Sequence, residues 1–286
     1  MITKERKNYI MKEFYILSNG VKIPSIGLGT WQSKEGSEAY NAVLWALKNG
    51  YRHIDTAYVY DNEASVGKAI IDSKINREEI FITSKLPANI KDYDKALEYF
   101  DKTIKNLNVT YLDLYLIHAP WPWENVGQDC TEGNIAVWKA MIKLYKEKKI
   151  RAIGVSNFSI SDIEKIVTAT NFKPMVNQIR YFIGNTQKEL TEYCMKNDIL
   201  VEAYSPFATG EILNNEILNR IAEKYHTSIA KICMAFCLQN HTLPLPKSIH
   251  EQRIIDNFNI DITLSPEDMD YLNKIDPIGT IKALRS

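Results

Sequence analysis

Several patterns that would place this 286-residue chain in a specialised class are missing. Its four cysteines, Cys130, Cys194, Cys233 and Cys237, form no C-x-x-C pair. Neither a disulfide framework nor a zinc site is therefore predicted, and we expect no metal. Cys233 and Cys237 are one helical turn apart, a spacing that favours packing on one helix face over a pair of ligands.

An excess of either charge is also missing. Lys plus Arg and Asp plus Glu both number 35, so the formal net charge is zero, which argues against binding nucleic acid or a membrane surface through bulk charge. No apolar run is long enough to cross a bilayer, and the charged segment Lys4–Lys7 precedes no apolar stretch. We expect a cytoplasmic protein, a monomer or weak homo-oligomer, with no nucleic-acid or membrane partner.

A complete glycine-rich dinucleotide motif is absent as well. The segment Gly27–Gln32 lacks the third glycine of G-x-G-x-x-G, which makes a Rossmann domain the weaker prediction. The hydrophobic fraction of 45% is enough for a sizeable core. We see no linker, repeat or low-complexity segment. The sequence therefore predicts a disordered tail at residues 1–13 and one domain at residues 14–286.

What the chain does contain is a regular alternation of strand and helix patterns. Phe14–Pro24 alternates around Asn19-Gly20, a strong hairpin signal. The strands expected after it are Ile26–Gly29, His53–Asp55, Phe81–Leu86, Leu112–Ile117, Ala152–Val155, Met175–Ile179, Leu200–Tyr204 and Leu243–Pro246. The helices expected are Glu38–Asn49, Glu63–Ser73, Asp94–Leu107, Asn134–Lys148, Ile160–Ala169, Gln187–Asn197, Ser228–Asn240, Glu251–Phe258 and Pro266–Ile275. Roughly eight such units predict an α/β fold, a (β/α)8 TIM barrel with an N-terminal β-hairpin and extra helices near its C-terminus.

Polar side chains gather where the predicted strands end. In parallel sheets the carboxyl ends of the strands are where ligands and catalytic groups collect. Asp55 ends one strand and Tyr60 follows five residues later. Lys85 lies near the end of the next, a position that is costly for a lysine unless a carboxylate neutralises it. His118 follows the fourth strand. These side chains are candidates for proton transfer.

Three spaced motifs resemble the aldo-keto reductase family. The first is Gly50–Ala57 with Glu63 and Gly67, and the second is Ile153–Phe158. The third is Leu245–Ser248 with Arg253 and Asn257. The resemblance extends from about Phe14 to about Ile275. It implies an NADPH-dependent oxidoreductase that reduces aldehydes and ketones to alcohols, reversibly, on a TIM barrel.

The resemblance implies a catalytic tetrad of Asp55, Tyr60, Lys85 and His118. Reducing a carbonyl needs a hydride at carbon and a proton at oxygen, and a free tyrosine has a pKa of about 10. Lys85 would lower that value, Asp55 would hold Lys85, and Tyr60 would give the proton. His118 would orient the carbonyl oxygen. Taken alone, Asp55 could cap a loop and Tyr60 could be a packing residue. Their occurrence together with Lys85 and His118 at the ends of three strands favours a catalytic role.

The resemblance also implies a site for NADPH/NADP+. The residues implied on the nicotinamide side are Thr30, Asp55, Ser156, Asn157, Gln178, Tyr204 and Ser205, with Tyr204 stacked on the ring. Lys247, Ser248 and Arg253 resemble a 2′-phosphate site, and Asn257 an adenine contact. Two cations and a hydroxyl suit a phosphate, which favours NADPH over NADH.

The substrate is less well defined by the sequence. The candidates for its wall are Trp31, Val59, Trp121, Trp123 and Phe207, together with His118. Relatives carry tryptophan where this chain has Ala119, and an acid-aromatic-His-Pro run where it has Arg180–Ile183. An alternative is a non-catalytic nicotinamide-binding sensor or regulatory barrel, and another is a phosphate-handling lyase or isomerase barrel. A measurement of carbonyl turnover with NADPH distinguishes a reductase from a non-catalytic sensor and from a lyase or isomerase.

Overall fold

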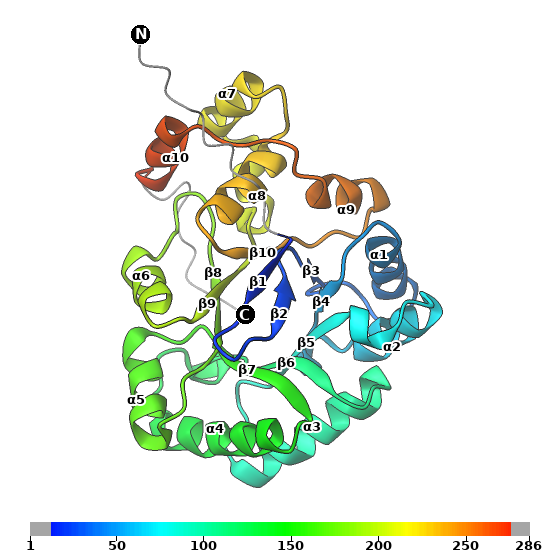
Figure 1. Cartoon of the computed structure of the whole chain (residues 1–286), viewed down its shortest axis with the longest axis vertical. Helices are drawn as coiled ribbons and strands as arrows, with labels where there is room; N and C mark the ends of the chain where they lie inside the picture. Colours follow the sequence, from blue (N-terminus) through cyan, green and yellow to red (C-terminus); the bar gives the residue numbers. More distant parts are fainter. Residues whose placement is uncertain (1–12, 276–286) are drawn as a thin grey trace.

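Eight parallel strands lie side by side in chain order, with helices around them, in a computed structural model that describes residues 13–275 (Figure 1). The strands are β3 (Leu28–Gly29), β4 (His53–Asp55), β5 (Phe81–Leu86), β6 (Leu112–Ile117), β7 (Ile150–Ser156), β8 (Val176–Arg180), β9 (Leu200–Tyr204) and β10 (Leu243–Leu245). The predicted (β/α)8 barrel is confirmed. The predicted tail, 1–13, lies outside the described residues except for Glu13.

Two backbone hydrogen bonds join the first and last strands of the sheet. The N–H of Gly27 donates to the carbonyl of Pro244 at 3.2 Å, and that of Gly29 donates to Pro246 at 3.0 Å. A Cβ at Gly27 would lie 2.6 Å from both His53 Nδ1 and Leu245 Cδ2. Glycine is therefore required for this close approach, which brings the two edges of the sheet together.

The helices agree with the predicted ranges, with one omission. They are α1 (Ser37–Lys48), α2 (Glu63–Asp72), α3 (Tyr93–Leu107), α4 (Thr131–Lys146), α5 (Ile160–Thr170), α6 (Lys188–Lys196), α7 (Glu216–Lys224), α8 (Ile229–Gln239), α9 (Glu251–Phe258) and α10 (Pro266–Asn273). Helix α7 was not among the helices predicted from the sequence. Its signals were present, since Asn215 accepts from the N–H groups of Ile217 and Leu218, and Leu218 and Ile221 are buried on one face.

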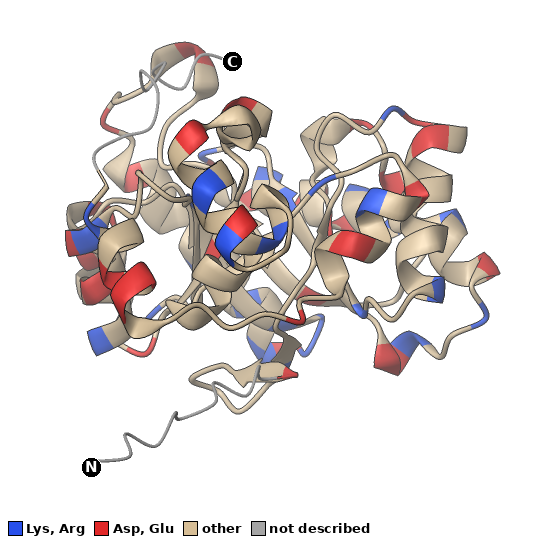
Figure 2. Cartoon of the chain, turned by 90° about the horizontal axis from the view of Figure 1, so that it is seen from above, with Lys and Arg blue, Asp and Glu red and all other residues tan. Residues whose placement is uncertain are grey.

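The predicted hairpin is confirmed and covers the amino end of the barrel. Strands β1 (Phe14–Ile16) and β2 (Lys22–Pro24) pair antiparallel, with Gly20 at φ 84° in the turn between them. The hairpin lies across the barrel in Figure 1 and projects from one end of it in Figure 2. Its buried side chains pack with the barrel's inward-facing residues, among them Leu114 and Leu116. The opposite, carboxyl end is left for a functional site.

The helices pack on the barrel through apolar faces and carry both charges outside. The larger core includes Trp138 of α4 and both Cys233 and Cys237 of α8, which are fully buried. Along the helices seen in Figure 2, basic and acidic residues are interspersed. Across residues 13–275, no helix has the length and apolar character needed to cross a membrane.

Candidate active site

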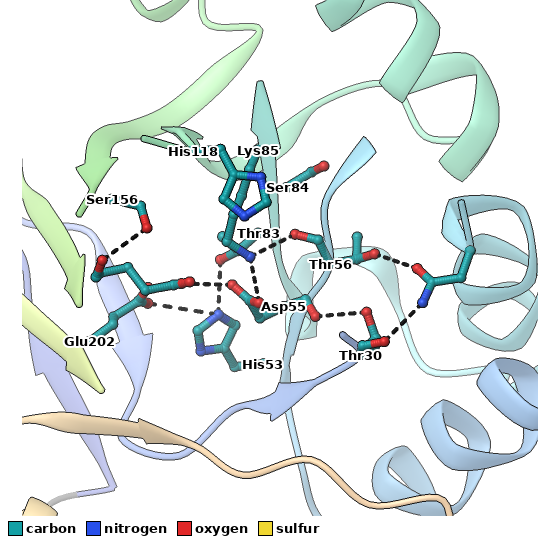
Figure 3. A network of polar contacts seen from close by, with 12 residues as sticks. Thr30, His53, Asp55, Thr56, Thr83, Ser84, Lys85, His118, Ser156 and Glu202 are labelled. Atoms are coloured by element: carbon teal, nitrogen blue, oxygen red, sulfur yellow. Dashed lines mark hydrogen bonds and ion pairs between the residues drawn. The ribbon is translucent and has the colours of Figure 1, made fainter. Parts of the chain in front are cut away.

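The ends of three neighbouring strands bring three of the four predicted catalytic residues, Asp55, Lys85 and His118, together (Figure 3). Asp55 ends β4, Lys85 lies in β5, and His118 directly follows β6. The Lys85 side chain is fully buried, and its Nζ donates to Asp55 Oδ1 at 2.6 Å and to the carbonyl of Thr56 at 2.9 Å. Burial acts to lower the pKa of Lys85, but the charge of Asp55, the neighbouring Tyr60 and the hydrogen bond to Asp55 together outweigh it, so the pKa is raised and the ammonium stays charged.

A short pinned turn positions Tyr60. Residues Tyr58–Tyr60 form one 3-10 turn, which ends where Asp61 takes a left-handed φ of 53°. Asn62, fully buried, accepts from Thr56 Oγ1 at 2.8 Å and donates to the carbonyls of Thr30 and Ser33, both at 2.9 Å. Asn62 was not among the predicted site residues, although an asparagine directly before a predicted helix was an available signal.

Tyr60 lies between the charge of Lys85 and the ring of His118. Lys85 Nζ is 5.0 Å from the centroid of the Tyr60 ring, and the His118 ring is 5.6 Å away, edge to face. Burial raises the pKa of Tyr60, whereas Lys85 acts in the lowering direction. The predicted effect of Lys85 therefore has the expected sign, but burial outweighs it in this structure. A phenol held protonated is suited to donating a proton.

His118 is an uncharged imidazole at neutral pH. Burial and the nearby charge of Lys85 hold the pKa of His118 well below its usual range. Its Nδ1 is buried without a hydrogen-bond partner among the described residues. Its ring also meets that of Trp123 edge to face at 5.6 Å. The ring is placed to hydrogen-bond a substrate oxygen without bringing a second positive charge beside Lys85.

The ends of β7, β8 and β9 form a linked polar group beside the tetrad. Ser156 Oγ donates to the carbonyl of Gln178 at 2.9 Å. Asn157 Nδ2 donates to Ser156 Oγ and to the carbonyl of His118, each at 3.0 Å, while Asn157 Oδ1 accepts from the Tyr204 hydroxyl at 2.8 Å. These bonds hold four of the seven predicted nicotinamide residues in one cluster.

The structure adds Glu202 of β9, which the sequence analysis did not single out. Gln178 Nε2 donates to Asp55 Oδ2 and to Glu202 Oε2, both at 2.8 Å. Burial raises the pKa of Glu202 to about 8, and the charge of Asp55 acts in the same direction. His53 Nε2 lies 4.0 Å from Glu202 Oε1, and burial lowers the pKa of His53 to about 3. An acid within an apolar strand was the available signal.

A cavity of about 670 Å³ opens at this end of the barrel. Twelve of the predicted site residues line it: Trp31, Asp55, Val59, Tyr60, His118, Ser156, Asn157, Gln178, Tyr204, Ser205, Lys247 and Arg253. Trp123 and Phe207 line it as well. Its wall near the tetrad is thus largely aromatic and apolar.

The other predicted site residues lie behind or beside the cavity. Thr30 Oγ1 donates to the carbonyl of Asp55 at 3.0 Å. The buried Lys85 contacts the cavity wall through its hydrogen bond to Asp55 Oδ1. Trp121 lies behind Trp123, with 5.1 Å between ring centroids. Ser248 and Asn257 are buried near α9, with Ser248 Oγ accepting from the N–H of His250 at 3.1 Å.

Two cations stand at the far side of the cavity. Lys247 follows β10 and is half-buried, and Arg253 is exposed on α9. Neither takes part in an ion pair with another residue in 13–275. Cations without a carboxylate partner suit an incoming phosphate. Over the same residues, no cluster of three or more His, Cys, Asp or Glu is arranged to hold a metal ion.

Comparison with known proteins gives a consistent result. The model of the Aldo/keto reductase family matches residues 25–277. A glyoxal reductase of Bacillus subtilis (strain 168) is 45% identical over 273 residues, which is 94% of this chain and 96% of that protein. A 9,11-endoperoxide prostaglandin H2 reductase of Trypanosoma cruzi (strain CL Brener) is 41% identical, covering 92% of each chain.

Solved structures agree with these sequence relatives. The crystal structure of an aldo/keto reductase from Brucella melitensis matches with a TM-score of 0.86 and 40% identity, covering 92% of this chain and 99% of the other. That of a Bombyx mori aldo-keto reductase in complex with NADP matches with a TM-score of 0.83 and 32% identity, covering 92% of both chains.

Proposed function

Since the chain belongs to the aldo-keto reductase family, whose relatives here are named as reductases, we propose that it reduces aldehydes and ketones to alcohols with NADPH, reversibly. One observation carries the proposal. A charged, fully buried Lys85 is bound to Asp55 at 2.6 Å and lies 5.0 Å from the Tyr60 ring, and Tyr60 and His118 line the cavity. A barrel that only bound a nicotinamide would have no use for this arrangement.

Tyr60 is the proposed proton donor. Its hydroxyl keeps its proton until the carbonyl oxygen accepts it, and the charge of Lys85 stabilises the phenolate that remains. Asp55 and the carbonyl of Thr56 hold Lys85 in place throughout. His118, uncharged, donates a hydrogen bond to the carbonyl oxygen and fixes its orientation. A bound NADPH would supply the hydride.

The polar groups of the cavity fit this cofactor. Ser156, Asn157 and Gln178 would hold the carboxamide, and the Tyr204 ring would lie against the nicotinamide. Lys247 and Arg253 would bind the 2′-phosphate, with Ser248 and Asn257 supporting that end. The fit rests on two side-chain oxygens that can still accept a hydrogen bond, Asn157 Oδ1 and Gln178 Oε1, and on two cations unpaired within the described residues.

The substrate proposal follows from the wall of the cavity. Trp31, Val59, Trp123 and Phe207 surround the approach to Tyr60 without offering a charged group. Uncharged carbonyl compounds therefore suit the site better than ionised ones. Glyoxal belongs in the test panel because it is the compound named for the Bacillus subtilis relative.

Tyr60→Phe tests the proton donor. We expect kcat for carbonyl reduction to fall about 10²- to 10⁴-fold, with NADPH binding unchanged, measured by nicotinamide absorbance over a panel of aldehydes and ketones. Tyr58→Phe is the matched control, because Tyr58 is in the same turn but packs on Tyr99 instead. Full activity in Tyr60→Phe would refute the assignment. Bound cofactor without turnover of any carbonyl by the unaltered protein would favour a sensor.

Removal of the two cations tests the preference for NADPH. In Lys247→Ala and Arg253→Ala we expect the Kd for NADPH to rise roughly 10- to 100-fold, the effect of losing a charged hydrogen bond, while the Kd for NADH stays within about twofold. Fluorescence titration with both cofactors side by side measures this. Lys188→Ala on α6 is the control for the loss of one charge. Equal losses for the two cofactors would contradict the 2′-phosphate assignment.

A further inference from the structure

The side-chain amide of Gln178 is held between two acids. Its Nε2 donates one hydrogen to Asp55 Oδ2 and the other to Glu202 Oε2, each at 2.8 Å. Asp55 comes from β4 and Glu202 from β9, so the amide is bound from two sides of the barrel. Both hydrogens of the amide are therefore used by carboxyl groups of the barrel interior.

This arrangement determines which end of the amide faces the cofactor. A flipped amide would place Gln178 Oε1 against Asp55 Oδ2, an oxygen of the carboxylate that forms an ion pair with Lys85, so two acceptors would face each other. The flipped state is thus disfavoured. In the observed state Oε1 makes no hydrogen bond among residues 13–275, and the Gln178 side chain lines the cavity. The amide oxygen Oε1 is therefore the atom of Gln178 that can accept a hydrogen bond from a ligand.

The role of Glu202 proposed next rests on the proposed function, because it requires that the chain binds NADPH. We propose that Glu202 is a positioning residue for the nicotinamide: with Asp55 it fixes the Gln178 amide so that Oε1 accepts a hydrogen bond from the carboxamide N–H₂ of the cofactor. With one acceptor alone, the plane of the amide could rotate about the axis of its single hydrogen bond. Two acceptors on the two hydrogens fix its plane as well.

A purely structural role does not account for Glu202. The side chain is fully buried, and its Oε1 has no hydrogen-bond partner within the described chain, with His53 Nε2 4.0 Å away and already 2.9 Å from Thr83 Oγ1. Burying an acid with one oxygen unsatisfied is costly, and an apolar residue would fill the space at lower cost. We therefore attribute the presence of Glu202 to the hydrogen bond that it accepts from Gln178.

Binding of NADPH and of 2′,5′-ADP to Glu202 variants tests the proposal. The second compound has the 2′-phosphate and adenosine but no nicotinamide. In Glu202→Leu, calorimetric titration should give a Kd for NADPH raised about five- to tenfold, the effect of one weakened hydrogen bond, and an unchanged Kd for 2′,5′-ADP. Glu202→Gln keeps an oxygen acceptor and should bind both compounds within about twofold of the original protein.

Glu63→Leu is the matched control. Glu63 is also a buried acid bound by two donors, Ser84 Oγ at 2.7 Å and Asn106 Nδ2 at 3.0 Å, but it does not line the cavity. This variant should be less stable, but any change in Kd should be the same for NADPH and for 2′,5′-ADP. If Glu202→Leu does not fold, Glu202→Asp, which withdraws the acceptor by one methylene, is judged by the same criteria.

The outcomes separate this inference from the proposed function. Unchanged NADPH binding in Glu202→Leu, or equal losses for NADPH and 2′,5′-ADP, would overturn the role of Glu202 while leaving the reductase proposal intact. Failure of the unaltered protein to bind NADPH would instead overturn the function on which the inference rests.

Discussion

Ionisable side chains inside the barrel have pKa values shifted in opposite directions. Burial raises the pKa of Glu202 to about 8 and lowers that of His53 to about 3, and the two groups lie within 4.0 Å. Asp55 and Lys85 face the same space as a bound ion pair. The acid and the histidine are thus both uncharged near neutrality, which leaves one positive and one negative charge beneath Tyr60.

The pKa of Glu202 predicts a pH dependence of stability. Between its ordinary pKa of about 4.5 and about 8, the folded protein keeps a proton that the unfolded chain has released, so stability falls as pH rises through this window. In Glu202→Gln this loss is absent. We expect the variant to gain stability relative to the original protein between pH 5 and pH 8, by at most about 1.4 kcal/mol per pH unit.

Urea unfolding of both proteins at pH 5, 6.5 and 8 measures this difference. The loss of stability that His53 causes as pH falls from about 6.5 towards 3 is common to both proteins and cancels. A stability difference that does not change with pH would contradict the shifted pKa.

At the level of elements, close approaches between helices depend on single glycines. Gly67 of α2 lies against the end of α3, where an added Cβ would be 2.1 Å from the carbonyl oxygen of Leu107. A backbone atom cannot move aside as a flexible side chain can. Gly67 is also part of the first family motif, so that motif includes a packing requirement beside Asp55, the proposed catalytic acid.

Gly67→Ala therefore tests the packing of α2 on α3. We expect a loss of about 1–3 kcal/mol, the usual range for overpacking, seen as a lower denaturation midpoint. Lys68→Ala is the control on the same helix, because the Lys68 side chain is 68% exposed and its loss should cost no more than about 0.5 kcal/mol. A Gly67→Ala protein as stable as Lys68→Ala would show that α2 can shift without cost.

At the level of the whole molecule, the cavity joins parts of the chain that are far apart in sequence. Its lining runs from Gly29 in β3 to Arg253 on α9, so a ligand there contacts both edges of the sheet that the Gly27 and Gly29 hydrogen bonds bring together. The hairpin covers the other end and leaves this one open. Ligand binding should therefore stabilise the barrel as a unit.

NADPH should raise the thermal midpoint of the folded chain. At a free concentration of 100 times Kd, a ligand that binds only the folded state contributes about 2.7 kcal/mol, which corresponds to a rise of about 5–10 °C for a protein of this size. Differential scanning fluorimetry with NADPH and NADH measures this shift. Tyr60→Phe should keep this shift, since that change removes only the hydroxyl of the proposed proton donor. No shift at saturating NADPH would count against a folded cofactor site.

Most of this arrangement could be predicted from local features of the sequence. The barrel follows from local periodicity, and Asp55, Lys85 and His118 could be placed together because parallel strands end at one edge. Helix α7 was missed although its cap and apolar face are local features. The choice of Trp123 over Trp121 as the cavity wall could not be predicted, because it depends on how the 3-10 turn at Trp123–Asn125 directs each ring.

The sequence by itself determined the fold class and the family, and it proposed the tetrad, because these depend on spacing along the chain. Only the tertiary structure decided which side chains meet across the barrel. Gln178 and Asp55 are 123 residues apart, and their contact with Glu202 depends on how far each strand is staggered against its neighbours. That stagger is set by the closed sheet as a whole, so no local pattern contains it.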